Sequence, residues 1–235
     1  MKSKIVAIVL VALLASGCAY SNAGDAEELS TFAEKSDNSS YHILYNFSME
    51  GTSLISHSTG EAEIFSYKGR TRFDRFLTFA GGGSRVSIYE KGENSSVRCT
   101  KTVEGNNTTN ECVDTNSTAS RYIDATEYTD PENSVNYAGE REYAGRTCKL
   151  YKIGLPPSEF EESEYIRSGA IADICVDKEK GYMAYNSLKL AEPLNISGRQ
   201  VRNLYTLKAQ GYNENVNSDD VRPPENLTLV NSSTS

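Results

Sequence analysis

Cysteine is the residue type in this 235-residue chain whose spacing bears most directly on its chemistry. Four of the five cysteines, Cys99, Cys112, Cys148 and Cys175, lie far from the N-terminus. In an exported chain an even number of cysteines indicates a disulfide framework. Three connectivities are open, and we favour the sequential one, Cys99 with Cys112 and Cys148 with Cys175, because the first pair would join the two arms of one hairpin. A four-thiolate zinc site is the alternative, and the lack of any C-x₂-C spacing argues against it.

The fifth cysteine, Cys18, follows what has the form of an export signal. Residues 1–4 carry two lysines, residues 5–15 are an unbroken apolar run, and small residues precede Cys18. Eleven residues rise about 16 Å as a helix, roughly half of a bilayer core, so a spanning helix is not expected. Residues 14–18 resemble a prokaryotic lipobox, in which the cysteine becomes the lipid-modified first residue. The alternative is an ordinary signal peptide with an incidental cysteine, because Ala15 stands where leucine is commonest.

Acceptor sequences for N-glycosylation are more frequent than chance placement predicts. If they carry sugar, their asparagines must face solvent. A lipobox together with dense acceptors indicates an archaeal cell-surface protein, whereas polar loops without sugar are the alternative. The nine predicted sites are Asn38, Asn46, Asn94, Asn106, Asn107, Asn116, Asn195, Asn226 and Asn231.

The remaining chemistry-bearing residues match no catalytic motif. The only histidines are His42 and His57, and neither lies near the signature of a serine or cysteine nucleophile. The glycines at 81–83 lack the lysine and hydroxyl residue of a phosphate loop and indicate a flexible connection. Acidic residues at 159–164 fit a solvated helix face better than a carboxylate pair. We therefore expect no enzyme activity, no cofactor and no metal site.

The composition excludes further classes of function. The formal net charge is −8, and 38% of the residues are hydrophobic. An acidic chain lacks the basic patches that displace counterions from nucleic acid, so no nucleic-acid partner is expected. The hydrophobic share is that of a globular protein.

The hydrophobic pattern predicts one helix followed by many strands. Leu29, Phe32 and Ala33 share one face of a helix expected over residues 25–36. Residues 41–50 then alternate apolar with polar, which is typical of a strand with one buried face. Further strands are expected at 61–68, 71–79, 85–90, 97–103, 111–114, 146–153, 171–177, 182–190 and 201–209.

The fold class expected from this order is α+β and mostly β. Strands at short spacing without crossover helices predict a curved antiparallel sheet, covered by the N-terminal helix and by a second short helix at 158–168. The predicted segments are a signal peptide at 1–17, a lipidated tether at 18–24, a single β-rich domain at 25–212 and a disordered polar tail at 213–235.

One stretch carries a family resemblance. The order of a helix, long strands, then Tyr67-Lys68-Gly69-Arg70-Thr71-Arg72-Phe73-Asp74 and a strand ending at Ile88-Tyr89 resembles the LolA-like lipoprotein-carrier superfamily. The resemblance implies an incomplete barrel closed by helices, whose concave face holds acyl chains. It covers roughly residues 25–210. The four internal cysteines depart from the periplasmic carriers, and no carrier residue transfers to a position of this chain.

Two functions follow as expectations. The first is an exported, non-catalytic lipoprotein, anchored through Cys18 to the outer face of the cytoplasmic membrane, whose sheet binds a lipid or acyl chain. The second is a glycosylated surface domain with a solid core that structures, senses or contacts envelope proteins. The side chains expected to face a ligand are Ile43, Tyr45, Phe47, Phe73, Leu77, Phe79, Val86 and Ile88, and the alternative is that they form the core.

Overall fold

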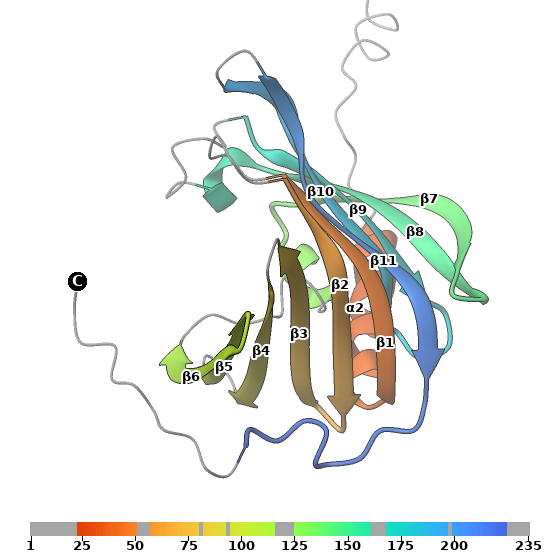
Figure 1. Ribbon diagram of the computed structural model, residues 1–235. Coiled ribbons are helices and arrows are strands. Elements are labelled where there is room, and N and C mark those ends of the chain that lie inside the picture. Colours follow the sequence, from red (N-terminus) through yellow and green to blue (C-terminus); the bar gives the residue numbers. More distant parts are fainter. Residues whose placement is uncertain are drawn as a thin grey trace, which may run out of the picture.

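The described part of the protein consists of one antiparallel sheet, a covering α-helix and two short 3-10 turns (Figure 1). The computed structural model describes residues 23–50, 57–79, 82–92, 95–115, 125–160, 168–196 and 199–224. The elements are α2 (Ala23–Asp37), β1 (Ser40–Glu50), β2 (His57–Tyr67), β3 (Arg70–Phe79), β4 (Gly82–Gly92), β5 (Ser95–Glu104), β6 (Asn107–Thr115), η1 (Ala125–Tyr128), β7 (Ser134–Tyr143), β8 (Arg146–Leu155), η2 (Pro157–Phe160), β9 (Ala170–Asp177), β10 (Met183–Ile196) and β11 (Arg199–Asn213). Among these residues no helix is long and apolar enough to cross a membrane.

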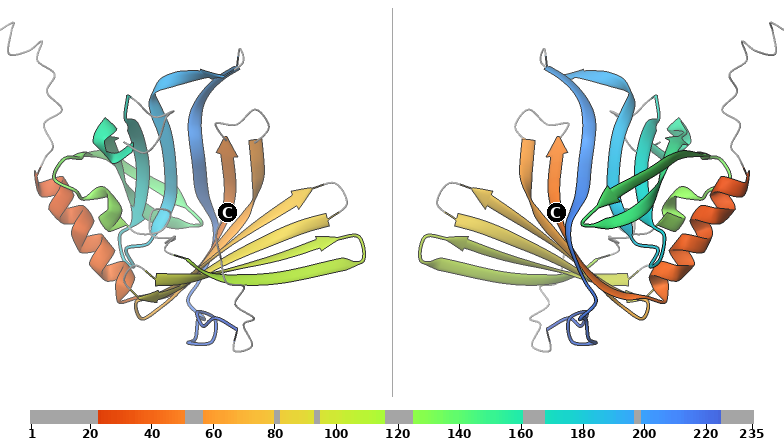
Figure 2. Two further views of the ribbon diagram at one scale, coloured as in Figure 1. Left: turned by 90° about the vertical axis from the view of Figure 1, so that its left-hand side faces the viewer. Right: turned by 90° about the vertical axis from the view of Figure 1, so that its right-hand side faces the viewer.

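The sheet is strongly curved and does not close. Its strand order is β6-β5-β4-β3-β2-β1-β11-β10-β9-β8-β7, so β6 and β7 are the two edges. In the left view of Figure 2, β3–β6 swing away from β8–β10, and α2 lies on the side of β7–β9. The expected class, a mostly β protein with a curved antiparallel sheet and an N-terminal helix, is therefore confirmed.

Alternation along β1 decides which face of the sheet is buried. Tyr41, Ile43, Tyr45 and Phe47 are at most 3% exposed, whereas the residues between them are half-buried or exposed. The same core contains the helix residues expected to share one face, Leu29, Phe32 and Ala33. We call the face that carries the odd-numbered β1 side chains the inner face, and the opposite one the outer face.

Hydrogen bonds across the interior join distant strands on the inner face. The Tyr45 hydroxyl donates to the Met183 carbonyl at 2.6 Å, which links β1 to the start of β10. Tyr128, from η1, lies 2.9 Å from the Tyr205 hydroxyl, and the Asn186 amide donates to Tyr128 at 3.2 Å. All three of these side chains are buried, and they hydrogen-bond to one another. The interior between β1 and β10 is filled by side chains.

Three sequence-based expectations need correction. No strand was expected at Ser134–Tyr143, yet β7 forms there and pairs with β8 along its length. Gly82 and Gly83, expected in a flexible connection, begin β4, and a Cβ at Gly82 would lie 1.9 Å from the Val103 carbonyl oxygen. Of the second helix expected at 158–168, the structure shows a short 3-10 turn at Pro157–Phe160, and 161–167 lie outside the described residues.

The prediction that the polar tail is disordered also needs correction at its start, because residues 214–224 are ordered. They pass over the outer face, where Val221 is 1% exposed. The Asp220 carbonyl accepts a hydrogen bond of 2.6 Å from Arg72 of β3. A polar composition suggested disorder, but one buried valine and one backbone contact to a sheet arginine fix this segment. The remaining tail residues, 225–235, lie outside the described part.

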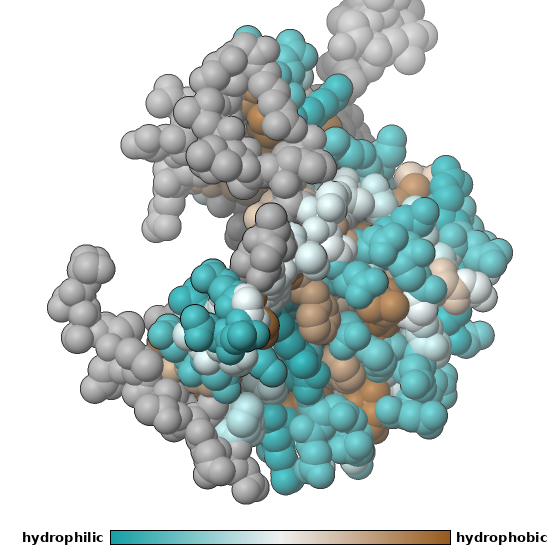
Figure 3. Space-filling model, viewed as in Figure 1, coloured by the Kyte–Doolittle hydropathy of each residue, from teal (hydrophilic) through white to brown (hydrophobic). Residues whose placement is uncertain are grey.

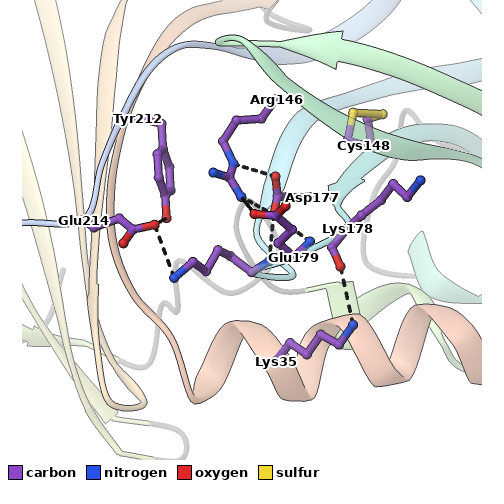
Figure 4. A network of polar contacts seen from close by, with 10 residues as sticks. Lys35, Arg146, Cys148, Asp177, Lys178, Glu179, Tyr212 and Glu214 are labelled. Atoms are coloured by element: carbon purple, nitrogen blue, oxygen red, sulfur yellow. Dashed lines mark hydrogen bonds and ion pairs between the residues drawn. A yellow bond between two sulfur atoms is a disulfide. The ribbon is translucent and has the colours of Figure 1, made fainter.

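A network of polar contacts ties the turn after β9 to its neighbours (Figure 4). Arg146 donates to both carboxylate oxygens of Asp177, at 2.8 and 3.2 Å, and its guanidinium lies 4.5 Å from the Tyr212 ring. Lys35 of α2 donates to the Lys178 carbonyl at 3.4 Å. The Cys148–Cys175 disulfide lies beside this network, since Cys148 is paired with Asp177 in the sheet. The helix, the turn and three strands are thus held together at one corner.

A partly exposed ion pair joins α2 to β8, and it predicts that the free energy of unfolding falls at acidic pH. Glu28 of α2 accepts hydrogen bonds from Lys149 and, at 2.7 Å, from the Tyr151 hydroxyl. These two contacts lower the pKa of the Glu28 carboxyl. A carboxyl whose pKa is lower when folded stabilises the protein at neutral pH, and this stabilisation is lost as the pH falls through the folded-state pKa, below 4.5.

We expect Glu28→Gln to lose this pH dependence. Between pH 6 and pH 3 the free energy of unfolding should fall more for the wild type than for the variant. The difference should be less than about 1 kcal/mol, because Glu28 is more than a third exposed. Urea titrations across that pH range measure it. Parallel pH profiles for the two proteins would show that the ion pair does not stabilise the fold.

Candidate functional site

The structure divides the eight side chains expected to face a ligand into two groups. Ile43, Tyr45, Phe47 and Phe73 are at most 4% exposed and belong to the main core, packed with α2 and the far strands. Leu77, Val86 and Ile88 are half-buried, and Phe79 has a side chain outside the described residues. The sequence could not separate the two groups, because both alternate in the same way along their strands.

The three half-buried residues form one patch on the inner face, which we call the inner strip (Leu77, Val86 and Ile88). In the register of β3 and β4, Ile88 is opposite Phe73, and Val86 is opposite Arg75. Ile88 packs against the main core, so the strip continues the core outward along β3 and β4. It is the part of the predicted ligand face that the packed interior leaves accessible.

Polar residues bound the strip on its open side. On β5 the inner positions next to the strip are Arg98, Thr100 and Thr102, and the β4 residue opposite Leu77 is Ser84. The inner face therefore changes from a packed apolar core through a narrow apolar strip to a polar edge. Such an arrangement suits a ligand that is apolar along most of its length and polar at one part.

The outer face differs in character. Seen from the side opposite α2, hydrophilic residues cover most of β1–β3, with hydrophobic residues separated from one another (Figure 3). Among the described residues the exposed large hydrophobic side chains are Val103, Tyr137 and Ile171, each 37–44% exposed. In this view, the described residues of that face form no contiguous apolar patch that competes with the inner strip as a binding surface.

Comparison with known proteins gives structural likeness alone. No protein-family model and no curated protein matches this sequence. The chain is similar to a solved structure of the lipoprotein LppX from Mycobacterium tuberculosis, with 12% identity, a TM-score of 0.49, and coverage of 84% of this chain and 99% of that one. It is also similar to MucB in the Pseudomonas aeruginosa MucA/MucB complex, with 14% identity, a TM-score of 0.47, and coverage of 88% and 63%.

A third solved structure is a putative outer membrane lipoprotein-sorting protein domain from Vibrio parahaemolyticus, with 9% identity, a TM-score of 0.34, and coverage of 86% and 97%. The chain spans less than two thirds of the length of MucB in that complex. What these proteins bind is not carried to this chain by likeness, and the function is argued below from the chain's own residues.

The other predicted site residues are the cysteines and the glycosylation acceptors, some of which lie outside the described residues. The structure pairs Cys99 with Cys112 and Cys148 with Cys175, the pairing that we favoured. Cys18 lies outside the described residues. The described glycosylation acceptors are all exposed, namely Asn38, Asn46, Asn106, Asn107 and Asn195, whereas Asn94, Asn116, Asn226 and Asn231 lie outside them.

The described residues bring together no catalytic constellation. His42 lies on the outer face, stacked on the Phe65 ring at 4.2 Å, and its Nε2 is 3.8 Å from the Glu63 carboxylate. No group of three or more His, Cys, Asp or Glu side chains within the described ranges could hold a metal ion. The side chain of His57 is not among those described.

One residue of the site was not predicted from the sequence. It is Arg75, which lies on β3 between Phe73 and Leu77. In the structure its guanidinium lies 5.7 Å from the Phe47 ring, on the inner face beside the strip. The sequence signal for it is a charged residue at an inward position of an apolar strand, because burial of a charge is unfavourable unless a partner compensates it.

Proposed function

We propose that this protein is an exported, non-catalytic lipoprotein that binds a hydrophobic chain along the inner strip. The observation that carries the proposal is the unclosed sheet, which leaves Leu77, Val86 and Ile88 half-buried beside a packed core. Burial of an acyl chain there is favourable by about 0.8 kcal/mol per methylene group. The narrow width of the strip fits one chain better than several.

Anchoring and export belong to the same proposal. Cys18 would carry the lipid that holds the protein on the outer face of the cytoplasmic membrane, and two disulfides suit an oxidising compartment outside the cell. Only four residues separate Cys18 from the start of α2 at Ala23. The folded domain would therefore stay close to the membrane, within reach of lipid ligands. Exposed acceptor asparagines would carry the glycans.

A second function is favoured by a different observation. Half of the expected ligand-facing residues are core, and the Tyr45 hydroxyl reaches Met183 across the interior. A protein with this solid core could serve as a glycosylated interaction or sensor domain that contacts envelope proteins. It would take up no lipid at all, which separates the two functions experimentally.

Lipid uptake by the exported chain, made soluble by Cys18→Ser, tests the proposal. Native mass spectrometry after incubation with a C16 chain should show one chain per protein, and Val86→Asp should lower its occupancy at least tenfold, because a carboxylate would face the methylene groups. Ile171→Asp is the matched control, since Ile171 is an exposed residue on the outer face of β9. A wild-type protein without bound lipid would favour the solid-core function.

A further inference from the structure

Arg75 is a charged residue in an apolar part of the inner face. On the same face of β3 its neighbours are Phe73 and Leu77. The residues opposite it on β2 and β4 are Ala62 and Val86. All four are hydrophobic, and Phe73 and Ala62 belong to the main core. The Nε of Arg75 is buried and has no hydrogen-bond partner in the described structure. A buried N–H without an acceptor is costly, so this position is unfavourable unless something else meets the guanidinium.

The Nε of Arg85 is likewise buried without a hydrogen-bond partner, but Arg75 differs from the other half-buried arginines in its charge contacts. Among the described residues, four arginines are half-buried, and three of them hold a carboxylate. Arg72 and Arg85 both donate to Asp74, and Arg146 donates to Asp177. Arg75 is the fourth, and its contact within the described structure is the Phe47 ring. Within the described ranges, a counterion therefore meets each half-buried arginine except the one beside the inner strip.

We propose that Arg75 binds the anionic head group of the hydrophobic ligand, which makes that ligand a singly acylated oxyanion such as a carboxylate or a phosphate. This inference rests on the proposed function, because the inner strip must hold the chain. Arg75 lies between Phe73 and Leu77 on the strand that forms one side of the strip. A chain lying along Leu77, Val86 and Ile88 would place its head group within reach of the guanidinium.

The chemistry of arginine supports an oxyanion over other polar heads. The guanidinium stays charged at all physiological pH values and offers several N–H donors to carboxylate or phosphate oxygens. Charge-assisted hydrogen bonds are about twice as strong as neutral ones, and they gain strength where water is excluded. Two hydroxyl side chains lie on the same inner face. Ser84 is on β4, one strand away from Arg75, and Thr100 is on β5, two strands away. They could donate to the remaining oxygens.

Binding of matched C16 probes to the full exported chain with Cys18→Ser tests the inference. Hexadecanol and hexadecanoate differ at the head group alone, and hexadecyl phosphate separates a phosphate from a carboxylate. Wild type should bind at least one of the two anions about tenfold more tightly than hexadecanol. Arg75→Met should remove this preference and leave hexadecanol binding within about twofold. Arg70→Met is the matched control, an exposed arginine on the outer face of the same strand β3, and should keep the preference.

The outcomes distinguish this inference from the function on which it rests. If wild type binds all three probes equally, or if Arg75→Met keeps the preference, Arg75 does not recognise the head group, while lipid binding stands. If wild type binds none of the probes, both proposals fail. Urea unfolding of Arg75→Met gives a second check. A urea midpoint far below that of the wild type would show that Arg75 is a structural residue.

Discussion

Replacing Asp74 by alanine is expected to destabilise the protein by about 3–5 kcal/mol, because it leaves two arginines without their shared counterion. The Asp74 side chain is fully buried on the outer face. Its Oδ2 accepts hydrogen bonds from Arg72, at 3.0 and 2.7 Å, and from Arg85. The guanidinium of Arg72 also stacks on the Phe65 ring at 4.1 Å. Removing the carboxylate would leave both positive charges facing each other in a region with little water.

The loss should extend to the ordered start of the tail. Arg72 donates to the Asp220 carbonyl at 2.6 Å, so the same arginine binds Asp74 and holds residues 214–224 on the sheet. In Asp74→Ala we expect residues 214–224 to be cleaved by protease at concentrations that leave the wild type intact. Urea unfolding and limited proteolysis followed by mass analysis measure the two effects.

Glu63→Ala provides the matched control for Asp74→Ala. Glu63 lies directly opposite Asp74 on the same outer face, but its side chain is 26% exposed, and its described charge contact is His42 at 3.8 Å. Its removal should cost less than about 1 kcal/mol. Equal destabilisation by the two variants would show that stability depends on the total charge of this face. It would contradict a specific contribution from the ion pairs of Asp74 with Arg72 and Arg85.

Removing the Cys148–Cys175 disulfide is expected to cost more than removing Cys99–Cys112. Each loop closure is worth about 3 kcal/mol in the chain-entropy model. The separations of 27 and 13 residues give the longer loop an advantage of about 0.6 kcal/mol. Burial adds to this difference, because Cys148 and Cys175 belong to the main core, whereas Cys99 and Cys112 form a small separate cluster with Tyr89 and Val97.

Paired alanine variants separate these contributions. The Cys148→Ala, Cys175→Ala protein should unfold at a clearly lower urea concentration than the Cys99→Ala, Cys112→Ala protein. Hydrogen exchange should show a second difference. Without the Cys99–Cys112 bond, faster exchange should be confined to β5 and β6. A larger loss of stability from the Cys99–Cys112 pair would contradict this assignment of the two bonds.

Local patterns predicted much of the fold. Alternation at 41–50 identified β1 and its buried face, and the positions of the cysteines indicated their pairing. Strand β7 was missed because Ser134–Tyr143 has a buried pattern of one valine among polar residues, and its place in the sheet comes from pairing with β8. The ordered segment at 214–224 was missed because a few separate contacts hold it, namely the buried Val221, the Asp220 carbonyl and the Glu214 carboxylate.

The candidate site was predicted in outline but not in detail. Period-two alternation indicates which face of a strand is inward, and it placed Leu77 and Val86 correctly on the inner face. It carries no information about what lies across the interior, so Ile43 and Tyr45 received the same interpretation although α2 and β10 cover them. The sequence could not predict that Arg75 has no carboxylate partner in the described structure, because acidic residues are abundant along the chain.

Mapping the contact of a bound chain tests the central claim most directly. A C16 carboxylic acid with a photoreactive diazirine in its chain would be bound to the Cys18→Ser protein, illuminated, and located by peptide mass spectrometry. We predict adducts in residues 73–88, on β3 and β4, and their loss in Val86→Asp. Adducts distributed over the outer face, or none above the level of the unfolded chain, would contradict lipid binding at the inner strip and favour a solid interaction domain.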